Sequence, residues 1–227
     1  MTEPASRPVS RRASRAAQRA SRDGAWNEDP PDSLEAVAAA VAQCRRCELW
    51  RDATQGVAGA GPASARLMLV GEQPGDQEDM AGAPFVGPAG RVLDQALERA
   101  GVARGQAFVT NAVKHFKHEM RGKRRLHKRP DAGEVAACRW WLEAERRLVR
   151  PRAIVAMGAT AALGAIGRPT PIAASRGRPF DLAGGARGLV TYHPSMILRV
   201  PDAAAKAAAF AALVEDLRLA ARLAGPG

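Results

Sequence analysis

The chain has 227 residues, of which 46% are hydrophobic and 4% aromatic, enough for one domain with a core of mainly Ala, Val and Leu. No apolar run approaches the ~18–20 residues of a membrane span, which argues against a membrane protein. The 34 Lys and Arg and 23 Asp and Glu side chains give a net charge of +11. Residues 1–22 (+5) and 117–129 (+6) hold this whole excess, a local concentration of charge that suits a polyanionic partner.

Residues 1–32 are predicted to form a disordered basic tail, because they are rich in Arg and Ser and offer no apolar face for an amphipathic transit peptide. Residues 33–227 are predicted to form a single domain, with a monomer as the default. The three cysteines are an odd number without a secretory signal. They indicate a reducing compartment, the cytoplasm, and favour a metal site or free thiols over disulfides.

Short apolar runs alternate with helical patterns along the domain. Helices are predicted from Ser33 to the first cysteines, around 92–100, from Pro130 to Val149, after Gly158 and over 202–224. The four predicted strands are 66–70, 107–110, 153–157 and 188–192. This alternation predicts an α/β fold, a three-layer sandwich with a central four-stranded parallel sheet.

Polar motifs follow three of these strands: Glu72–Gly75, Asn111 with the basic loop after it, and His193–Ser195. Ligands of such sheets bind beyond the carboxyl ends of the strands, so we expect the three motifs to meet in one crevice. Residues 72–79 include four carboxylates, whose repulsion a plain turn does not need. The glycines at 59 and 61 precede a strand instead of following one, which excludes a dinucleotide-binding loop.

Four motifs in this order resemble the iron–sulfur branch of the uracil-DNA glycosylases: residues 71–75 (GEQPG), 84–90 (PFVGPAG), 110–114 (TNAVK) and 193–195 (HPS). That branch usually has Ala where Gln73 stands and lacks the inserted residues 123–127 (KRRLH). Both departures look like the X-type members. The resemblance implies excision of uracil from DNA, preferably single-stranded, followed by covalent attachment of the protein to DNA.

Each crevice residue has an implied role and a structural alternative. Phe85 would stack on the flipped uracil or fill the core, Asn111 would bind the uracil edge or cap a strand, and His193 would donate to a uracil carbonyl or serve the fold. Ser195 would orient a DNA phosphate. The predicted substrate-binding residues are Gly71, Phe85, Asn111, Ser195, Lys123 and Arg124.

His127 is predicted to attack the anomeric carbon of the sugar, with Glu72 accepting a hydrogen bond from its other ring nitrogen and Arg125 holding the loop closed. The predicted catalytic residues are Glu72, Gln73, Asp76, Arg125, His127 and His193. In one alternative His127 is a base or phosphate contact of an ordinary multiple-turnover glycosylase. In another, the protein binds nucleic acid without catalysis.

Cys44 and Cys47 have the spacing of a ligand pair for zinc or an iron–sulfur cluster. Cys138 could complete the site or be a small core residue. Composition alone favours zinc, held by three cysteines and a histidine. The resemblance instead implies a [4Fe–4S] cluster with His115 as the fourth ligand, in a structural role.

Overall fold

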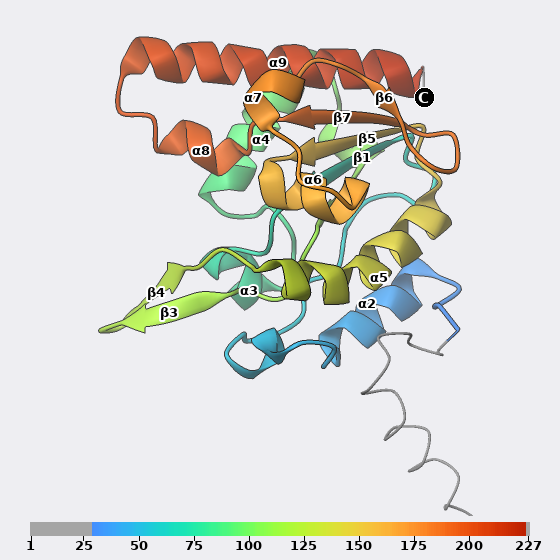
Figure 1. The fold of residues 1–227 in the computed structure, drawn as a ribbon, viewed down its shortest axis with the longest axis vertical. Coiled ribbons are helices and arrows are strands. Elements are labelled where there is room, and N and C mark those ends of the chain that lie inside the picture. The colour runs from blue at the N-terminus through green and yellow to red at the C-terminus, as the bar shows by residue number, and fades with distance from the viewer. Residues whose placement is uncertain (1–28, 226–227) are drawn as a thin grey trace, which may run out of the picture. The chain divides into compact units, whose positions relative to one another are not determined.

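The structure is a computed structural model that describes residues 29–225, so most of the predicted basic tail lies outside the described residues. Residues 31–225 belong to one compact unit. In chain order the elements are α2 (Leu34–Ala42), η1 (Glu48–Arg51), β1 (Leu67–Gly71), α3 (Asp76–Ala81), α4 (Pro88–Ala100), η2 (Arg104–Gln106), β2 (Ala107–Asn111), β3 (His118–Arg121), β4 (Arg124–His127), α5 (Ala132–Val149), β5 (Ala153–Met157), α6 (Ala159–Ile166), α7 (Ile172–Ser175), β6 (Phe180–Asp181), β7 (Arg187–Thr191), α8 (Pro194–Leu198) and α9 (Ala203–Ala224) (Figure 1).

The central sheet has five strands in the order β2-β1-β5-β7-β6. The four predicted strands are all present and pair in parallel. The prediction of a purely parallel four-stranded sheet is wrong, because β6 pairs antiparallel with β7 at the edge. With two residues, β6 is too short to leave an alternating pattern in the sequence.

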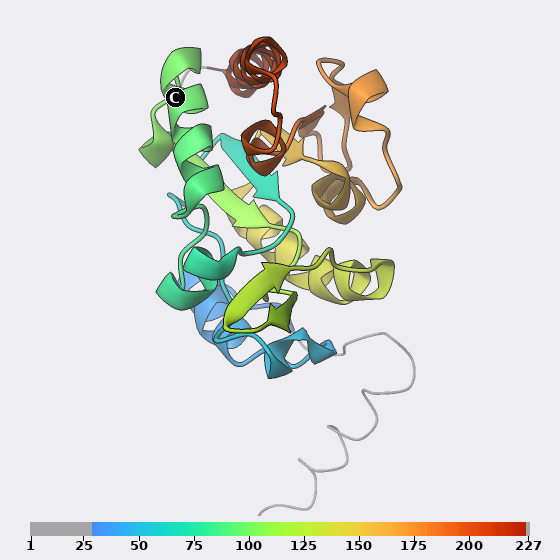
Figure 2. The same cartoon turned by 90° about the vertical axis from the view of Figure 1, so that its left-hand side faces the viewer.

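Successive side chains of a strand point to opposite faces of the sheet, and helices cover both faces. Leu67 and Leu69 of β1 pack with α4 and α9, whereas Met68 and Val70 pack with α5 and α6. Figures 1 and 2 show these helices on the two sides of the sheet. No helix among residues 29–225 is both long and apolar enough to cross a membrane.

The segment predicted as a basic loop folds into an antiparallel hairpin of β3 and β4, in which His118 lies opposite His127. The hairpin extends away from the central sheet (Figures 1 and 2). It leads into α5, whose predicted start is confirmed by the capping box of Asp131 and Glu134. The hairpin and α5 therefore lead the chain from the carboxyl end of β2 to the face of the sheet on which α5 and α6 pack.

Candidate functional site

Gly71 ends β1 directly opposite Asn111, which ends β2. A Cβ atom at position 71 would lie 2.4 Å from Oδ1 of Asn111 and 2.5 Å from the Phe85 ring, so glycine lets these two side chains meet at the strand end. Asn111 is 2% exposed, and its Oδ1 is buried without a hydrogen-bond partner among the described residues. A buried, unpartnered carbonyl is costly, which suits an acceptor that waits for a ligand.

Phe85 is buried and has a φ of 57°, a left-handed conformation that is costly for a residue other than glycine. Its ring centroid lies 6.0 Å from that of His193, with the two planes tilted by 33°. Phe85 also packs in the core beneath α4, so both roles considered for it remain compatible with its position. Backbone strain at a residue beside the ends of β1 and β7 favours a ligand-binding role.

His193 follows β7 and caps α8 with its own ring. Its Nδ1 accepts a hydrogen bond from the Ser195 amide at 3.1 Å and lies 2.8 Å from the Ser195 hydroxyl. The proton of the neutral ring is therefore on Nε2, which is buried and has no partner among the described residues. Burial lowers the pKa of His193 to about 4. The carboxyl ends of the strands thus carry a neutral N–H donor on His193 and an unpartnered acceptor on Asn111.

We predict that His193 stays neutral throughout the neutral and mildly acidic range. Imidazole ¹⁵N shifts should show an Nε2–H ring that titrates near pH 4 instead of 6.5. Between these values the unfolded chain binds a proton that the folded chain does not, so the free energy of unfolding should fall as the pH falls from 6.5 to 4. A midpoint near 6.5 would contradict the assigned tautomer and its environment.

Glu72 links the carboxyl end of β1 to the hairpin. Its Oε1 lies 3.1 Å from Nε2 of His127, and its Oε2 accepts a hydrogen bond of 2.7 Å from the Thr160 hydroxyl. Burial opposes ionisation of Glu72, but the hydrogen bonds from His127 and Thr160 outweigh it and lower the pKa of Glu72. The half-exposed His127 ring is therefore held against an ionised carboxylate just beyond the carboxyl end of β1.

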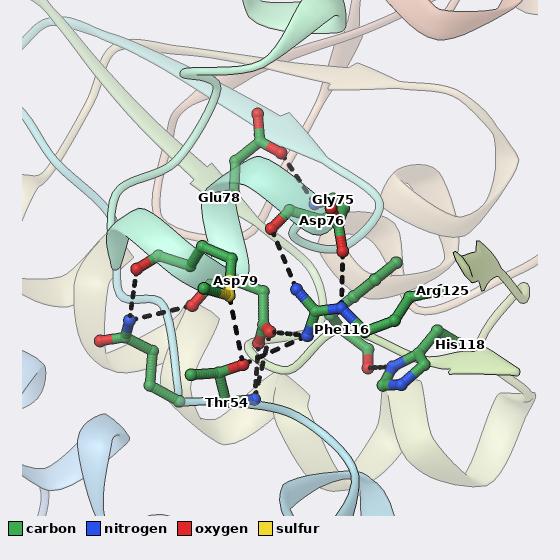
Figure 3. Close-up of polar contacts among 10 residues, drawn as sticks. Thr54, Gly75, Asp76, Glu78, Asp79, Phe116, His118 and Arg125 are labelled. Carbon is green, nitrogen blue, oxygen red and sulfur yellow. Dashed lines mark hydrogen bonds and ion pairs between the residues drawn. The ribbon is translucent and has the colours of Figure 1, made fainter. Parts of the chain in front are cut away.

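Arg125 latches the hairpin to α3 and the loop before β1 (Figure 3). Its Nε lies 2.6 Å from Oδ1 of Asp76, and another guanidinium nitrogen lies 2.5 Å from Oδ2 of the fully buried Asp79 and 3.2 Å from the Thr54 hydroxyl. The same guanidinium lies 5.5 Å above the Phe116 ring. Asp76, predicted to be catalytic, directs its carboxylate to Arg125. The closing role predicted for Arg125 therefore rests on two carboxylates, those of Asp76 and Asp79.

Gln73 clamps the base of the hairpin. Its buried amide oxygen accepts from the Lys117 amide at 3.0 Å, and its amide nitrogen donates to the carbonyl oxygens of Lys117 and Lys128 at 3.1 and 3.0 Å. The side chain therefore holds both ends of the hairpin together. At the far end, Lys123 and Arg124 are exposed, and among the described residues neither forms an ion pair, which leaves them available to phosphates.

The proposed metal ligands lie between α2, the loop after it and α5. Cys44, Cys138 and His115 are buried, and Cys47 is half-buried. A hydrogen bond with Cys138 lowers the pKa of Cys47 to about 7, and the same contact and burial raise the pKa of Cys138. Burial lowers the pKa of His115, whose Nδ1 has no partner among the described residues. A pocket of about 310 Å³ is lined in part by Cys44 and His115.

Lys114 and Glu145 form a buried ion pair that contacts the backbone of Asn111. Lys114 Nζ, which is fully buried, donates to Glu145 at 2.8 Å, to the Thr110 hydroxyl at 2.7 Å and to the Asn111 carbonyl oxygen at 3.0 Å. The other oxygen of Glu145 accepts from the Gly59 amide at 2.8 Å. Sequence reasoning missed this pair, because its members are 31 residues apart and no local pattern links them.

Sequence reasoning also missed Thr160, the hydroxyl partner of Glu72. A signal was available: Thr160 stands just after the carboxyl end of β5, at the same edge as the three predicted motifs. The rule that ligands bind beyond strand ends applies equally to β5, which is the predicted strand without a motif of its own.

Comparison with known proteins places these residues in a family. The model of the Uracil DNA glycosylase superfamily matches residues 58–218. A type-4 uracil-DNA glycosylase of Thermotoga maritima is 37% identical over 167 residues, covering 73% of this chain and 83% of the relative. One from Pyrobaculum aerophilum is 36% identical over 175 residues, covering 74% and 86%. A type-5 uracil-DNA glycosylase of that organism is 31% identical over 179 residues, covering 71% and 75%.

Proposed function

We propose that this chain, which belongs to the Uracil DNA glycosylase superfamily, excises uracil from DNA and is then captured on the resulting sugar through His127. It is a uracil-DNA glycosylase, an enzyme that cleaves an N-glycosidic bond. The capture step is the behaviour of the X-type members that residues 123–127 resemble. The observation that carries it is the placement of His127 against Glu72 at the crevice.

Base recognition follows from two buried polar atoms that have no partner among the described residues, Oδ1 of Asn111 and Nε2 of His193. The Asn111 amide offers an acceptor and a donor to the edge of uracil, and the Phe85 ring offers a stacking surface. When the bond between C1′ and N1 breaks, its electron pair leaves with the uracil ring and the sugar becomes positively charged. The N–H of His193 then donates to the uracil carbonyl that gains negative charge, which is an electrostatic stabilisation of the leaving group.

Capture uses the second charge of this step, the positive charge on the sugar. The ring nitrogen of His127 that does not face Glu72 carries a lone pair, which forms the new bond to C1′. The other ring nitrogen keeps its hydrogen bond to the Glu72 carboxylate, which stabilises the imidazolium that results. An N-alkylated imidazole has no easy hydrolytic exit, so the protein remains attached.

The hairpin is held in the position that capture needs. Arg125 fixes its middle to Asp76 and Asp79, and Gln73 fixes its base. These contacts stabilise His127 at Glu72 before DNA binds, which favours attack by the ring over attack by water. The exposed Lys123 and Arg124 suit the DNA backbone, and unpaired bases reach the crevice at least cost, so we propose a preference for single strands.

The test is incubation with single-stranded DNA that carries one uracil. The proposed function predicts release of one uracil per protein chain and a protein–DNA band that survives heating in detergent. Release of more uracil than enzyme added, without such a band, would select an ordinary multiple-turnover glycosylase. Absence of free uracil at any enzyme excess would select a protein that only binds nucleic acid.

We propose a [4Fe–4S] cluster as cofactor, held by Cys44, Cys47, Cys138 and His115. Three thiols, one of lowered pKa, and a neutral imidazole with an unpartnered nitrogen form a suitable donor set. Among the described residues no three His, Cys, Asp or Glu side chains lie together as ligands of a single metal ion. A cluster spreads its ligands over four iron atoms and would tie α2 to α5 without a part in the chemistry.

For this cofactor we predict coloured protein that contains iron and sulfide and no zinc. Cys138→Ala should lose the iron and become less stable to heat, whereas His115→Cys, which supplies a fourth thiolate, should keep both. Elemental analysis and thermal unfolding check this. Colourless protein with zinc in place of iron would overturn the assignment.

A further inference from the structure

The hydroxyl of Thr160 lies between the carboxylate of Glu72 and the guanidinium of Arg129. It donates to Oε2 of Glu72 at 2.7 Å and accepts from Nε of Arg129 at 3.0 Å. Thr160 is 2% exposed, so water does not compete freely for this hydroxyl. The three side chains and His127 therefore form one continuous chain of hydrogen bonds.

The donor and acceptor roles along these hydrogen bonds are fixed by the chemistry of the groups. An arginine nitrogen can only donate, so the Thr160 oxygen accepts from it and its single proton is directed to Glu72. With Oε2 held in this way, Oε1 is the carboxylate oxygen that faces His127. Losing the hydroxyl would leave Oε2 without this partner and free the carboxylate to turn.

In the part of the chain that the structure describes, the Thr160 hydroxyl forms no hydrogen bond within its own helix. Thr160 stands in the first turn of α6, but the residue at the N-cap is Gly158, and its side-chain contacts reach Glu72 and Arg129 instead of the helix backbone. Arg129 belongs to the segment that leaves the hairpin, two residues after His127. The segment that carries the nucleophile therefore also sets the orientation of the hydroxyl that holds Glu72.

We propose that Thr160, oriented by Arg129, is a positioning residue for the capture step and acts by fixing the Glu72 carboxylate toward His127. This inference rests on the proposed function. Among the described residues the Thr160 hydroxyl forms hydrogen bonds with Glu72 and Arg129 and none with Asn111 or His193, so it is expected to govern the fate of the sugar after uracil has left more than the departure of uracil itself. The share of excision events that end as adduct is therefore the quantity to measure.

The test compares Thr160→Val with Thr160→Ser in single-turnover reactions on uracil-containing single-stranded DNA, measuring free uracil and heat-stable adduct. Thr160→Val should lower the rate of adduct formation about tenfold or more, as loss of a hydrogen bond to a charged group does, and raise the share of free abasic DNA. As the pH is lowered, adduct formation by Thr160→Val should be lost at a higher pH than in the wild type. The reason is that Glu72 loses a hydrogen bond that favours its ionised form. Thr160→Ser should restore both.

A second variant keeps the inference testable if Thr160→Val does not fold. Arg129 is exposed, so Arg129→Gln should fold and should lower the adduct share in the same direction. An unchanged adduct share and pH profile in Thr160→Val, or in Arg129→Gln where only that variant folds, would overturn the proposal. So would a Thr160→Ser variant as impaired as Thr160→Val. Failure of the wild type to form any adduct would instead refute the proposed function itself.

Discussion

Replacing His127 with serine is expected to abolish the heat-stable adduct while uracil release continues. The machinery that breaks the glycosidic bond, Asn111 and His193, is untouched by this change. Serine leaves room for a water molecule beside Glu72, and the Glu72 carboxylate can accept a proton from that water. The initial rate of uracil release should therefore stay within about tenfold of the wild-type rate. Free uracil and a denaturing gel measure the two outcomes on one sample, and turnover should exceed one per chain.

His118→Ser is the matched control. His118 lies directly opposite His127 in the hairpin, stacks on Phe116 with a centroid distance of 5.0 Å and contacts the Phe116 carbonyl oxygen. None of the interactions of His118 with the described residues involves Glu72. Its replacement should therefore leave the adduct in place. An adduct that persists in His127→Ser, or that disappears only in His118→Ser, would assign capture to another nucleophile.

The four parallel strands of the central sheet could be predicted from sequence because they are buried on both faces. Each reads as a continuous apolar run, and the rule on strand ends then brought Glu72, Asn111 and His193 to one edge. The hairpin could not be predicted this way. Its strands are rich in charged and polar residues and have no apolar alternation, and contacts with distant residues, such as Gln73 and Asp79, hold it.

The same limit applies to the groups that support the site. Glu72 and His127 were found by their residue types and by the motifs around them. Thr160 and Glu145 are ordinary residues of helices, and only their partners give them a role. Local patterns thus identified the polar side chains at the strand ends and Arg125 of the hairpin, whereas Thr160 and Glu145 are linked to the site by pairings across the fold.

Lys114→Met is expected to cause the largest loss of stability among the changes considered. Methionine fills a similar volume, but Glu145 is then left as an unpaired carboxylate in a fully buried site. Breaking one side of a buried ion pair typically costs about 3–5 kcal/mol. Urea unfolding should show a lower midpoint with an unchanged slope. Because Lys114 also donates to the Asn111 carbonyl oxygen, folded protein should bind uracil-containing DNA less well.

Lys117→Met is the matched control. Lys117 pairs with Asp131 and Glu134 at 3.2 and 2.7 Å, but its side chain is 23% exposed, so water can replace it and the loss should stay below about 1 kcal/mol. Replacing Glu145 with glutamine in the Lys114→Met background removes the stranded charge and should recover part of the stability. If Lys114→Met unfolds no more readily than Lys117→Met, the buried pair contributes little. The support behind Asn111 must then come from the packing of β2 against β1.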